Sequence, residues 1–381
     1  MSKKDNMMFS ILRGGVAIGI ALLVAAVLIF ISAEGAGAGE KFAATADAMH
    51  NLLIRPVWGK NGLAIKSITD IMADMIPIIF TGLATCVMFS ANQFNMGGEG
   101  GVMLGAFVAG LCAIYIPMPA GIHMVFCLVV GALSVALMML IPGILKAKLD
   151  VSEMVCSLML NYVVMYMIKY LMNSFLADKS KGQIMTFPFA ETALVPQLVD
   201  NGSKLTWGFV VAIIVTIITG LFMYRTRWGY AIRMIGINQE FAKYSGIRVA
   251  FIVVLAQVLG GVIAGLGGGI EMLGRYNAFS WGALPGYGWT GMTVAIIAGN
   301  NPFLVPFAAL FMAYLDKGCS LMATYSGVPA QLIDIVQAVV FVFFAAEQFL
   351  SGYRQKLVVR AAQQEILEAE KKKKEEEGGN E

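Results

Sequence analysis

Long apolar stretches follow one another along most of this chain, and they constrain its fold more than any other feature. Hydrophobic residues make up 58% of the sequence and charged residues only 13%, whereas about a quarter of a soluble domain is charged. A helix crosses the roughly 30 Å hydrocarbon core of a bilayer with about 20 apolar residues, and its backbone must be hydrogen-bonded internally. The sequence therefore predicts an all-α, multi-pass protein of the cell membrane.

The spacing of the apolar stretches predicts about ten transmembrane helices. They are placed near 15–33, 70–91, 98–116, 122–144, 152–172, 206–224, 250–272, 287–299, 303–318 and 329–352. The eighth and ninth are short, and Asn300-Asn-Pro302 separates them, so either could be a half-helix. The first resembles a signal peptide, but its apolar run is long enough to span, which favours an uncleaved anchor.

Lysine and arginine set the predicted orientation, because they concentrate on the cytoplasmic side of a membrane. Ten spans place the following basic segments together on that side: Lys3, Lys4 and Arg13; Lys146 and Lys148; the loop 225–249; and Arg354–Arg360. Both termini are then inside, and the loops 34–69 and 173–205 are outside.

Three regions follow from this layout. Residues 1–69 form a membrane anchor with an extracellular loop, 70–355 form the transmembrane domain, and 356–381 form a charged cytoplasmic tail. Spans 2–5 and 7–10 are predicted to be an inverted repeat, because Gly97–Gly101 and Gly286–Gly288 each open an apolar helix and the two helices run in opposite directions. Compared directly, the sequences of the two halves match poorly.

A compact polar segment lies in the loop 225–249, between the sixth and seventh spans. Asn238 is a good helix N-cap, and Gly246 can adopt the left-handed conformation that ends a helix. Phe241 and Tyr244 lie three residues apart between them and share a face. This pattern indicates a short cytoplasmic helix that enters a groove of a partner; an ordinary cytoplasmic loop is the alternative.

Polar side chains also occur at membrane depth, where a charge costs on the order of 3 kcal/mol. Asn95 and Glu99 lie in a glycine-rich segment. Glu99 either faces the interior of the bundle or stabilises the free N–H groups at the start of its own helix, span 98–116. Near the outer ends of their spans lie Asn277, Trp281, Tyr287 and Trp289, which can stack and hydrogen-bond or anchor the helices at the membrane interface.

A polar stripe runs along the fifth span, where Glu153, Ser157 and Asn161 recur every four residues and should face the interior. Asp150 and Glu153 also fit the spacing of a capping box, which makes Asn161 the better candidate for a solute pathway. Gln331, Asp334 and Gln337 form a similar stripe in the last span.

Several chemistries have no signature in this sequence. It contains no phosphate-binding Gly-x-x-x-x-Gly-Lys-Ser/Thr loop, so ATP hydrolysis by that chemistry is excluded. His50 and His123 are isolated, and no catalytic triad or metal-ligand spacing appears, so neither an enzyme nor a metal or cofactor site is expected. The five cysteines fall in apolar segments without paired spacing, which indicates buried thiols.

Several of these segments, in this order, resemble permease subunits of bacterial ABC importers for nucleosides and simple sugars, within a wider group that includes permeases for ribose and branched-chain amino acids. The resembling segments are Phe94-Asn-Met-Gly-Gly-Glu99-Gly; Glu153-Met-Val-Cys-Ser-Leu-Met-Leu-Asn161-Tyr162; Gly236-Ile-Asn238-Gln-Glu-Phe-Ala242-Lys-Tyr244-Ser-Gly246-Ile; Gly286-Tyr-Gly-Trp-Thr-Gly291 with Asn300-Asn-Pro302; and Ser326-Gly-Val-Pro329 with Asp334-Ile-Val-Gln337. The sequence departs from the family pattern at Gly101, where the family has Gln, and at Met154, where it has Val.

The resemblance implies a set of partners and two sets of functional residues. Two permeases, this chain and a shorter homologue, would form the channel; separate ATP-binding subunits would lie beneath it, and an extracellular binding lipoprotein would deliver a nucleoside or sugar. The expected pathway residues are Asn95, Glu99, Asn161, Tyr162 and Trp289. The residues expected to couple to the ATPase, in a helix over 236–246 and just before it, are Arg233, Gly236, Asn238, Glu240, Phe241, Tyr244 and Gly246.

Two other classes of protein stay open. An ion-coupled secondary transporter or channel would need a charged ion site near the membrane midplane, for which Glu99 and Glu271 are the candidates, without a clear cationic partner. A membrane-embedded structural protein is disfavoured by the polar stripes.

Overall fold

A computed structural model describes residues 38–59, 62–178, 180–199 and 202–326, parts of 19–31, and Ile335 and Ala338. The chain divides into two units: Met1–Asn51 with Met322–Glu381, and Leu52–Leu321. Most of the predicted first span, most of span 329–352 with its stripe Gln331, Asp334 and Gln337, and the tail 356–381 lie outside the described residues. Within the smaller unit, Asn51 Nδ2 donates hydrogen bonds to Ser326 Oγ (2.7 Å) and Asp47 Oδ2 (3.1 Å).

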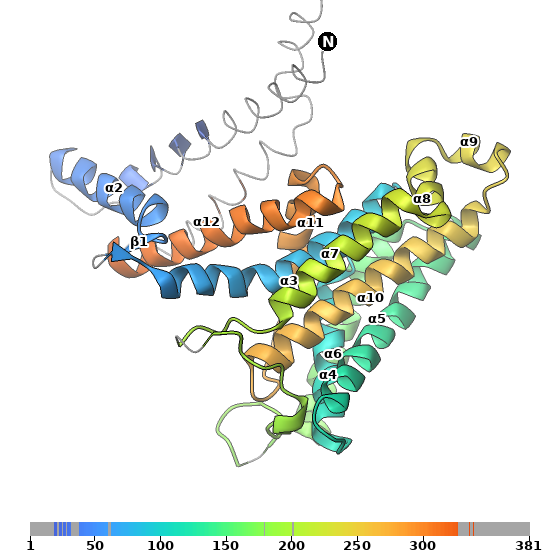
Figure 1. The fold of residues 1–381 in the computed structure, drawn as a ribbon, viewed down its shortest axis with the longest axis horizontal. Helices are drawn as coiled ribbons and strands as arrows, with labels where there is room; N and C mark the ends of the chain where they lie inside the picture. The colour runs from blue at the N-terminus through green and yellow to red at the C-terminus, as the bar shows by residue number, and fades with distance from the viewer. Residues whose placement is uncertain are drawn as a thin grey trace, which may run out of the picture. The chain divides into compact units, whose positions relative to one another are not determined.

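The larger unit is built mainly from helices (Figure 1). Its long helices are α3 (Ile65–Ser90), α4 (Gly98–Tyr115), α5 (Ile122–Leu149), α6 (Glu153–Leu171), α7 (Gly208–Arg225), α10 (Val249–Arg275) and α12 (Val305–Ser326, whose last residues belong to the smaller unit). Its short helices are α8 (Arg227–Ile237), α9 (Gln239–Tyr244), α11 (Tyr287–Ile297), a π-helical turn at Met172–Leu176, and 3₁₀ turns at Glu191–Ala193 and Pro302–Leu304. Seven helices of the described residues are long and apolar enough to cross a membrane. An all-α, multi-pass membrane fold is thereby confirmed.

The two short predicted spans differ from one another in the structure. Helix α11 has only 11 residues, about 16 Å of helix, which is half the thickness of a hydrocarbon core. Helix α12 has 22 residues and extends beyond the predicted 303–318. Of the two, α11 is therefore the half-helix.

The predicted extracellular loop 34–69 contains regular structure. Helix α2 spans Ala38–Leu53, and a two-stranded hairpin pairs β1 (Trp58–Gly59) with β2 (Gly62–Leu63). Four alanines between positions 43 and 48 give α2 a high intrinsic helix propensity. The polarity of residues 34–69 predicted a loop between two spans, and it did not indicate helix α2.

Helix α10 packs against three other helices through its glycines. Gly261 lies against Met139 of α5, Gly267 against Phe80 of α3, and Gly268 against the backbone of Val102 in α4. Small residues allow helices in lipid to approach closely enough for backbone contact. A β-carbon at Gly268 would collide with the Val102 carbonyl, so α10 is the helix around which α3, α4 and α5 are arranged (Figure 1).

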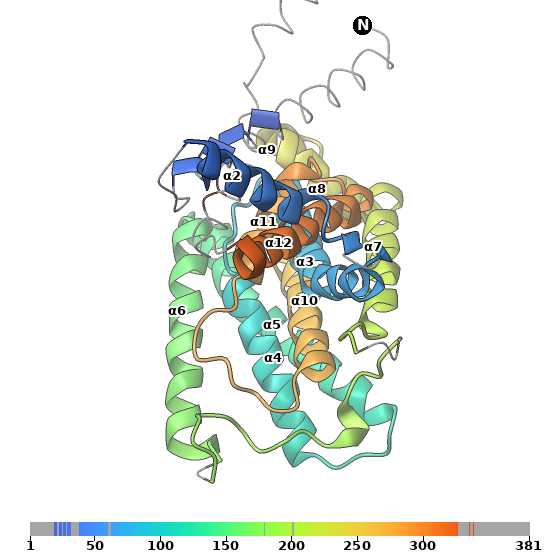
Figure 2. The ribbon, with the colours of Figure 1, turned by 90° about the vertical axis from the view of Figure 1, so that its left-hand side faces the viewer.

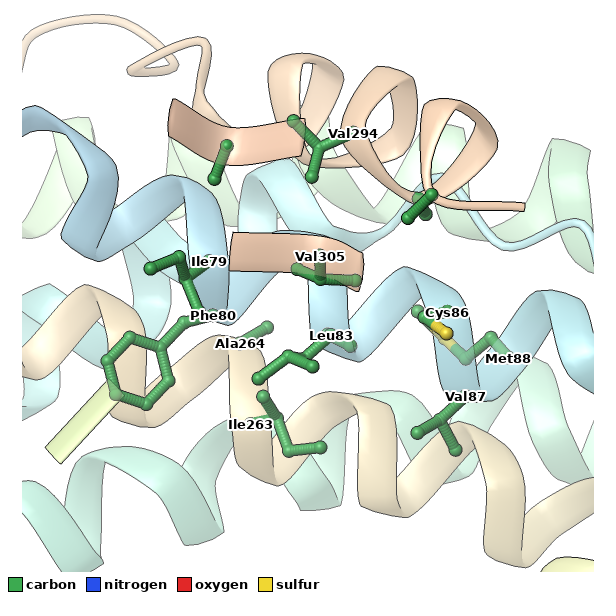
Figure 3. Packing of buried hydrophobic residues seen from close by; sticks show 14 of the residues in the cluster. Ile79, Phe80, Leu83, Cys86, Val87, Met88, Ile263, Ala264, Val294 and Val305 are labelled. Atoms are coloured by element: carbon green, nitrogen blue, oxygen red, sulfur yellow. The ribbon is translucent and has the colours of Figure 1, made fainter. Parts of the chain in front are cut away.

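The larger unit contains two clusters of buried hydrophobic residues, one centred on α3 and the other on α4 and α5. Phe80 and Leu83 of α3 are fully buried; Ile263 of α10 and Val294 of α11 belong to the same cluster (Figure 3). Gly82 faces Val294 and Val305, so α11 packs closely on α3. Helix α9 lies at one end of this bundle, and the segment between α6 and α7 lies at the opposite end (Figure 2).

Candidate functional site

The N-termini of two helices meet inside the bundle. Helices α4 and α11 each follow a non-helical linker, Ala91–Gly97 and Tyr276–Gly286. The position of a β-carbon on Gly98 is 3.9 Å from Gly288 Cα, and a β-carbon on Gly288 would collide with the backbone of Glu99. Glycine at 288 thus permits a contact between backbones that no other residue would allow.

From this meeting point the two helices run in opposite directions. The Ala113 carbonyl, near the end of α4, accepts a hydrogen bond (3.2 Å) from Ala190 in the segment between α6 and α7. Phe303, which follows α11, packs instead against Gly220 in the half of α7 that leads toward α8 and α9. The two glycine-rich helix starts that stand far apart in the sequence are therefore neighbours in space.

The Glu99 side chain connects the two helix starts. It lies in the first turn of α4 and is 1% exposed. Its Oε2 accepts hydrogen bonds from the backbone N–H groups of Gly288 (2.5 Å) and Trp289 (3.3 Å), and its Oε1 accepts one from Gly286. The sequence left open whether Glu99 stabilises N–H groups of its own helix; the N–H groups that its carboxylate binds belong to α11.

The polar stripe of α6 binds the backbone of the linker before α4 and of the first turn of α4. Glu153 Oε1 accepts from the Phe94 N–H (3.1 Å), Ser157 Oγ from the Met96 N–H (2.9 Å), and Asn161 Oδ1 from the Gly100 N–H (2.9 Å), while Asn161 Nδ2 donates to the Met96 carbonyl (2.9 Å). Non-helical backbone at membrane depth is tolerated only where its polar groups find partners. The stripe supplies these partners to Phe94, Met96 and Gly100, and its predicted inward orientation is confirmed by burial of all three of its side chains.

Asn95 extends this network to α10. Its Oδ1 accepts from the Gly97 N–H (2.6 Å), and its Nδ2 donates to Gln257 Oε1. Asn95 is 1% exposed and Gln257 is fully buried. The linker is therefore held from two sides, by α6 and by α10.

The predicted capping box at the start of α6 is wrong. Ser152 is the N-cap residue and makes no side-chain cap hydrogen bond, whereas Asp150 ends α5 in the left-handed conformation (φ 50°). Asp150 pairs with Lys146 one turn earlier in α5 (2.8 Å), and this ammonium group holds the pKa of Asp150 below its usual value. Lys146 Nζ also lies 3.5 Å from Glu153. Lys146 thus binds the carboxylates of Asp150 and Glu153, and Glu153 also accepts from the linker backbone.

The five predicted pathway residues are not equivalent in the structure. Asn95, Glu99 and Asn161 are buried and hydrogen-bonded to backbone around the start of α4. Trp289 contributes to this site through its backbone N–H, which donates to Glu99. The residues Trp289 and Tyr162, in contrast, are 45% and 49% exposed on the surface of the chain.

A charged cluster that sequence reasoning missed lies near the end of α10. Arg275 pairs with Asp74 of α3 and with Glu271 (3.2 Å), and the Tyr287 hydroxyl donates to Glu271 (3.0 Å). Glu271 therefore has a cationic partner, contrary to expectation. The spacing of Glu271 and Arg275, four residues apart on a helix, was the signal that could have revealed it.

The segment expected as one helix over 236–246 forms parts of two helices. Asn238 is extended (φ −157°), so it ends α8 and begins α9 at the same point. Gly236 lies in α8 against the Ser90 carbonyl, and the Arg233 guanidinium lies over the Tyr224 ring at 5.0 Å. Arg233 and Gly236 thus pack α8 onto the bundle rather than forming part of α9.

Helix α9 has the caps that the sequence predicts. Asn238 Oδ1 accepts from the Phe241 N–H (3.0 Å). Gly246 has φ 82°, and the N–H groups of Gly246 and Ile247 bind the carbonyls of Lys243 and Ala242, which is the Schellman arrangement. Glu240 lies in the first turn.

The surface of α9 is rich in exposed aromatic residues. Phe241 is 56% exposed and Tyr244 is 88% exposed. Beside α9, a cavity of about 780 Å³ is lined by the end of α5 and the start of α10. Two large aromatic side chains on a capped helix, next to a recess, form a surface suited to a protein partner.

The described residues form an apolar helical bundle with seven helices able to cross a membrane and with non-helical linkers buried between them, an arrangement typical of membrane transport domains. Residues 67–345 match the family described as "Branched-chain amino acid transport system / permease component". The chain belongs to this family. It is a multi-pass permease of the cell membrane and a transport component rather than an enzyme.

Several characterised proteins are similar along most of the chain. The guanosine ABC transporter permease protein NupP of Bacillus subtilis is 31% identical over 301 residues, which cover 78% of this chain and 86% of NupP. The nucleoside ABC transporter permease protein NupB of Lactococcus lactis is 31% identical over 311 residues, covering 77% and 85%. The glucose ABC transporter permease protein TsgB13 of Haloferax volcanii is 31% identical over 300 residues, covering 75% and 78%. No solved structure matches the chain significantly.

Proposed function

We propose that this permease imports nucleosides or simple sugars and that a separate ATP-binding subunit powers it. The observation that carries the proposal is the similarity, over three quarters or more of this chain, to permeases named for guanosine, nucleosides and glucose. An extracellular substrate-binding lipoprotein would deliver the substrate. ATP-driven movement of the subunits would then expose the pathway alternately to the two sides of the membrane.

The proposed assembly contains a second, homologous permease. Bacillus subtilis has a further guanosine permease protein, NupQ, and Lactococcus lactis a further nucleoside permease protein, NupC; each is 22% identical to this chain. NupQ and NupC are thus less similar to this chain than NupP and NupB, which are 31% identical to it. A heterodimer of this chain with a homologue is consistent with such pairs.

The proposed topology has ten spans with both termini in the cytoplasm, and spans 2–5 and 7–10 form an inverted repeat. Support comes from α4 and α11, which start at one point and run in opposite directions, as corresponding helices of an inverted repeat do. Residues 1–69 would be the anchor and extracellular loop, 70–355 the transmembrane domain with its coupling loop 225–249, and 356–381 the cytoplasmic tail.

The proposed pathway passes the point where α4 and α11 start. Substrate sites of transporters lie near the midplane, where helices are interrupted. Tyr162 and Trp289 offer exposed rings that can stack on a base or sugar, while Asn95, Glu99 and Asn161 hold the surrounding backbone in place. The ATP-binding subunit would receive α9 through Asn238, Glu240, Phe241, Tyr244 and Gly246, with Arg233 and Gly236 of α8 supporting it.

An ion-coupled transporter is the second candidate, because Glu271 is buried in the bundle. Two features of Glu271 disfavour it as an ion site at the midplane. Its carboxylate pairs with Arg275, and it lies within about 6 Å of the end of α10.

The substrate class can be tested by deleting the gene in its own organism and measuring uptake of labelled guanosine, glucose and leucine. We expect uptake of guanosine or glucose to fall in the deletion strain and to return when the gene is restored on a plasmid. Leucine uptake is the control and should be unchanged. Loss of leucine uptake alone would show that the proposed substrate class is wrong.

A further inference from the structure

Two helix N-termini face one another where α4 and α11 start, and this arrangement is electrostatically unfavourable. Each helix N-terminus carries the equivalent of about half a positive charge and several N–H groups without helical partners. The contact between Gly98 and Gly288 brings these two ends together at backbone distance. An isolated pair of such ends would repel, so this contact requires a negative group.

Glu99 supplies that group. Its position in the first turn of α4 places the carboxylate at the N-terminus of its own helix, while three N–H groups at the start of α11 bind it. Among the described residues, no cationic side chain forms an ion pair with Glu99. One carboxylate therefore balances both helix ends.

We infer that Glu99 is a positioning residue that fastens the N-terminus of α11 to that of α4, so that the half-helix α11 and the spanning helix α4 move as one piece during transport. The consequence for transport rests on the proposed function. The fastening itself follows from the contacts of Glu99 alone. Because Asn161 ties α4 to α6, and Asn95 ties the linker before α4 to α10, Glu99 joins α11 to that whole network.

The fastening can be tested by anion rescue of the purified full-length chain in detergent. Glu99→Ala removes the carboxylate and leaves a space beside three N–H groups, which formate can enter. We expect its thermal midpoint to lie below that of the wild type and to rise with formate concentration at constant ionic strength. Wild type should show no such rise.

Two further variants separate charge from packing. Glu99→Gln keeps an oxygen acceptor but loses the charge, so its midpoint should lie between those of wild type and Glu99→Ala. Gly288→Ala keeps the carboxylate but forces the two helix starts apart, and formate should not rescue it. If Glu99→Ala melts like the wild type, or if formate stabilises all the variants equally, the inference is wrong.

Transport gives the readout that a purely structural role would not change. In reconstituted complexes, the number of substrate molecules moved per ATP hydrolysed should fall in Glu99→Gln relative to wild type. A variant that is merely less folded would lose uptake and ATP hydrolysis in proportion, and an unchanged ratio would overturn the positioning role. If wild type moves neither guanosine nor glucose, the proposed function fails, while the formate experiment still decides the role of Glu99.

Discussion

Asn161 contacts backbone through both ends of its amide, and this use of polar side chains recurs at the site. Asn95 and Glu99 likewise bind backbone N–H groups of the linkers and helix starts. A buried polar group without a partner costs about 1–3 kcal/mol. These side chains are therefore necessary wherever the chain is not helical inside the bundle.

Asn161→Leu tests this role at the scale of one residue. The substitution leaves the Gly100 N–H and the Met96 carbonyl without their partner, so we expect the unfolding free energy to fall by about 2–5 kcal/mol. The thermal midpoint of the purified chain and its substrate uptake should both decrease. Met159→Leu, on the exposed face of the same helix, is the control and should leave both unchanged. Unchanged stability with normal uptake in Asn161→Leu would remove this residue from the site.

The spacing of polar residues predicted which face of α6 is buried but not what that face binds. Glu153, Ser157 and Asn161 recur with helical period, which is a local signal. Their partners lie about 60 residues away in the chain, in a linker whose path depends on the packing of α4 and α5. The Glu99 contacts to α11 span almost 190 residues, so the sequence contained no local signal for them.

Helix α9 is short, and its caps rather than its length define it. Six residues are too few for a helix that is stable on its own. The side chain of Asn238 and the left-handed Gly246 satisfy backbone groups at its two ends. The aromatic side chains of Phe241 and Tyr244 are thereby held in fixed positions at the surface.

Variants of α9 should lower the ATP hydrolysis that substrate stimulates. Tyr244→Ala removes an exposed aromatic anchor of the kind that dominates protein interfaces, and Gly246→Pro cannot adopt φ 82°. In reconstituted complexes we expect substrate-stimulated ATP hydrolysis to fall at least about tenfold, while the binding lipoprotein binds substrate normally. Tyr115→Ala, an exposed tyrosine at the far end of α4, is the control.

The same element also tests the proposed orientation. A cysteine introduced at Gln239 should react with an impermeant thiol reagent only after the cells are permeabilised, and one at Gly182 should react in intact cells. Full ATP hydrolysis in both α9 variants, or labelling of position 239 from outside, would contradict the coupling role.

Helix boundaries were predictable where capping chemistry is local and unpredictable where packing decides. The predicted span 98–116 corresponds to α4 at Gly98–Tyr115, and Asn238 and Gly246 bound α9 as expected. Helix α8 was not expected, because Gly236 was assigned to the helix that follows it. In the structure Gly236 instead allows α8 to approach the Ser90 carbonyl, a contact that depends on tertiary packing.

At the scale of the whole molecule, the sequence indicated a multi-pass membrane protein because lipid imposes length and polarity on every span. It also indicated two helices starting at glycine-rich segments and running in opposite directions. What it did not indicate is that these two starts touch. Because of that contact, two non-helical linkers end at the same place inside the bundle. A transport pathway is expected at such a place.

The central claim is that ATP hydrolysed by a partner subunit, rather than an ion gradient, drives this permease. The direct measurement is accumulation of labelled substrate in proteoliposomes that contain the complete complex, with the binding lipoprotein on the outer side. We predict accumulation only when hydrolysable ATP is present on the side of α9, and no effect of ionophores that dissipate proton and sodium gradients. Accumulation without ATP, driven by an imposed proton or sodium gradient and abolished by ionophores, would contradict the account.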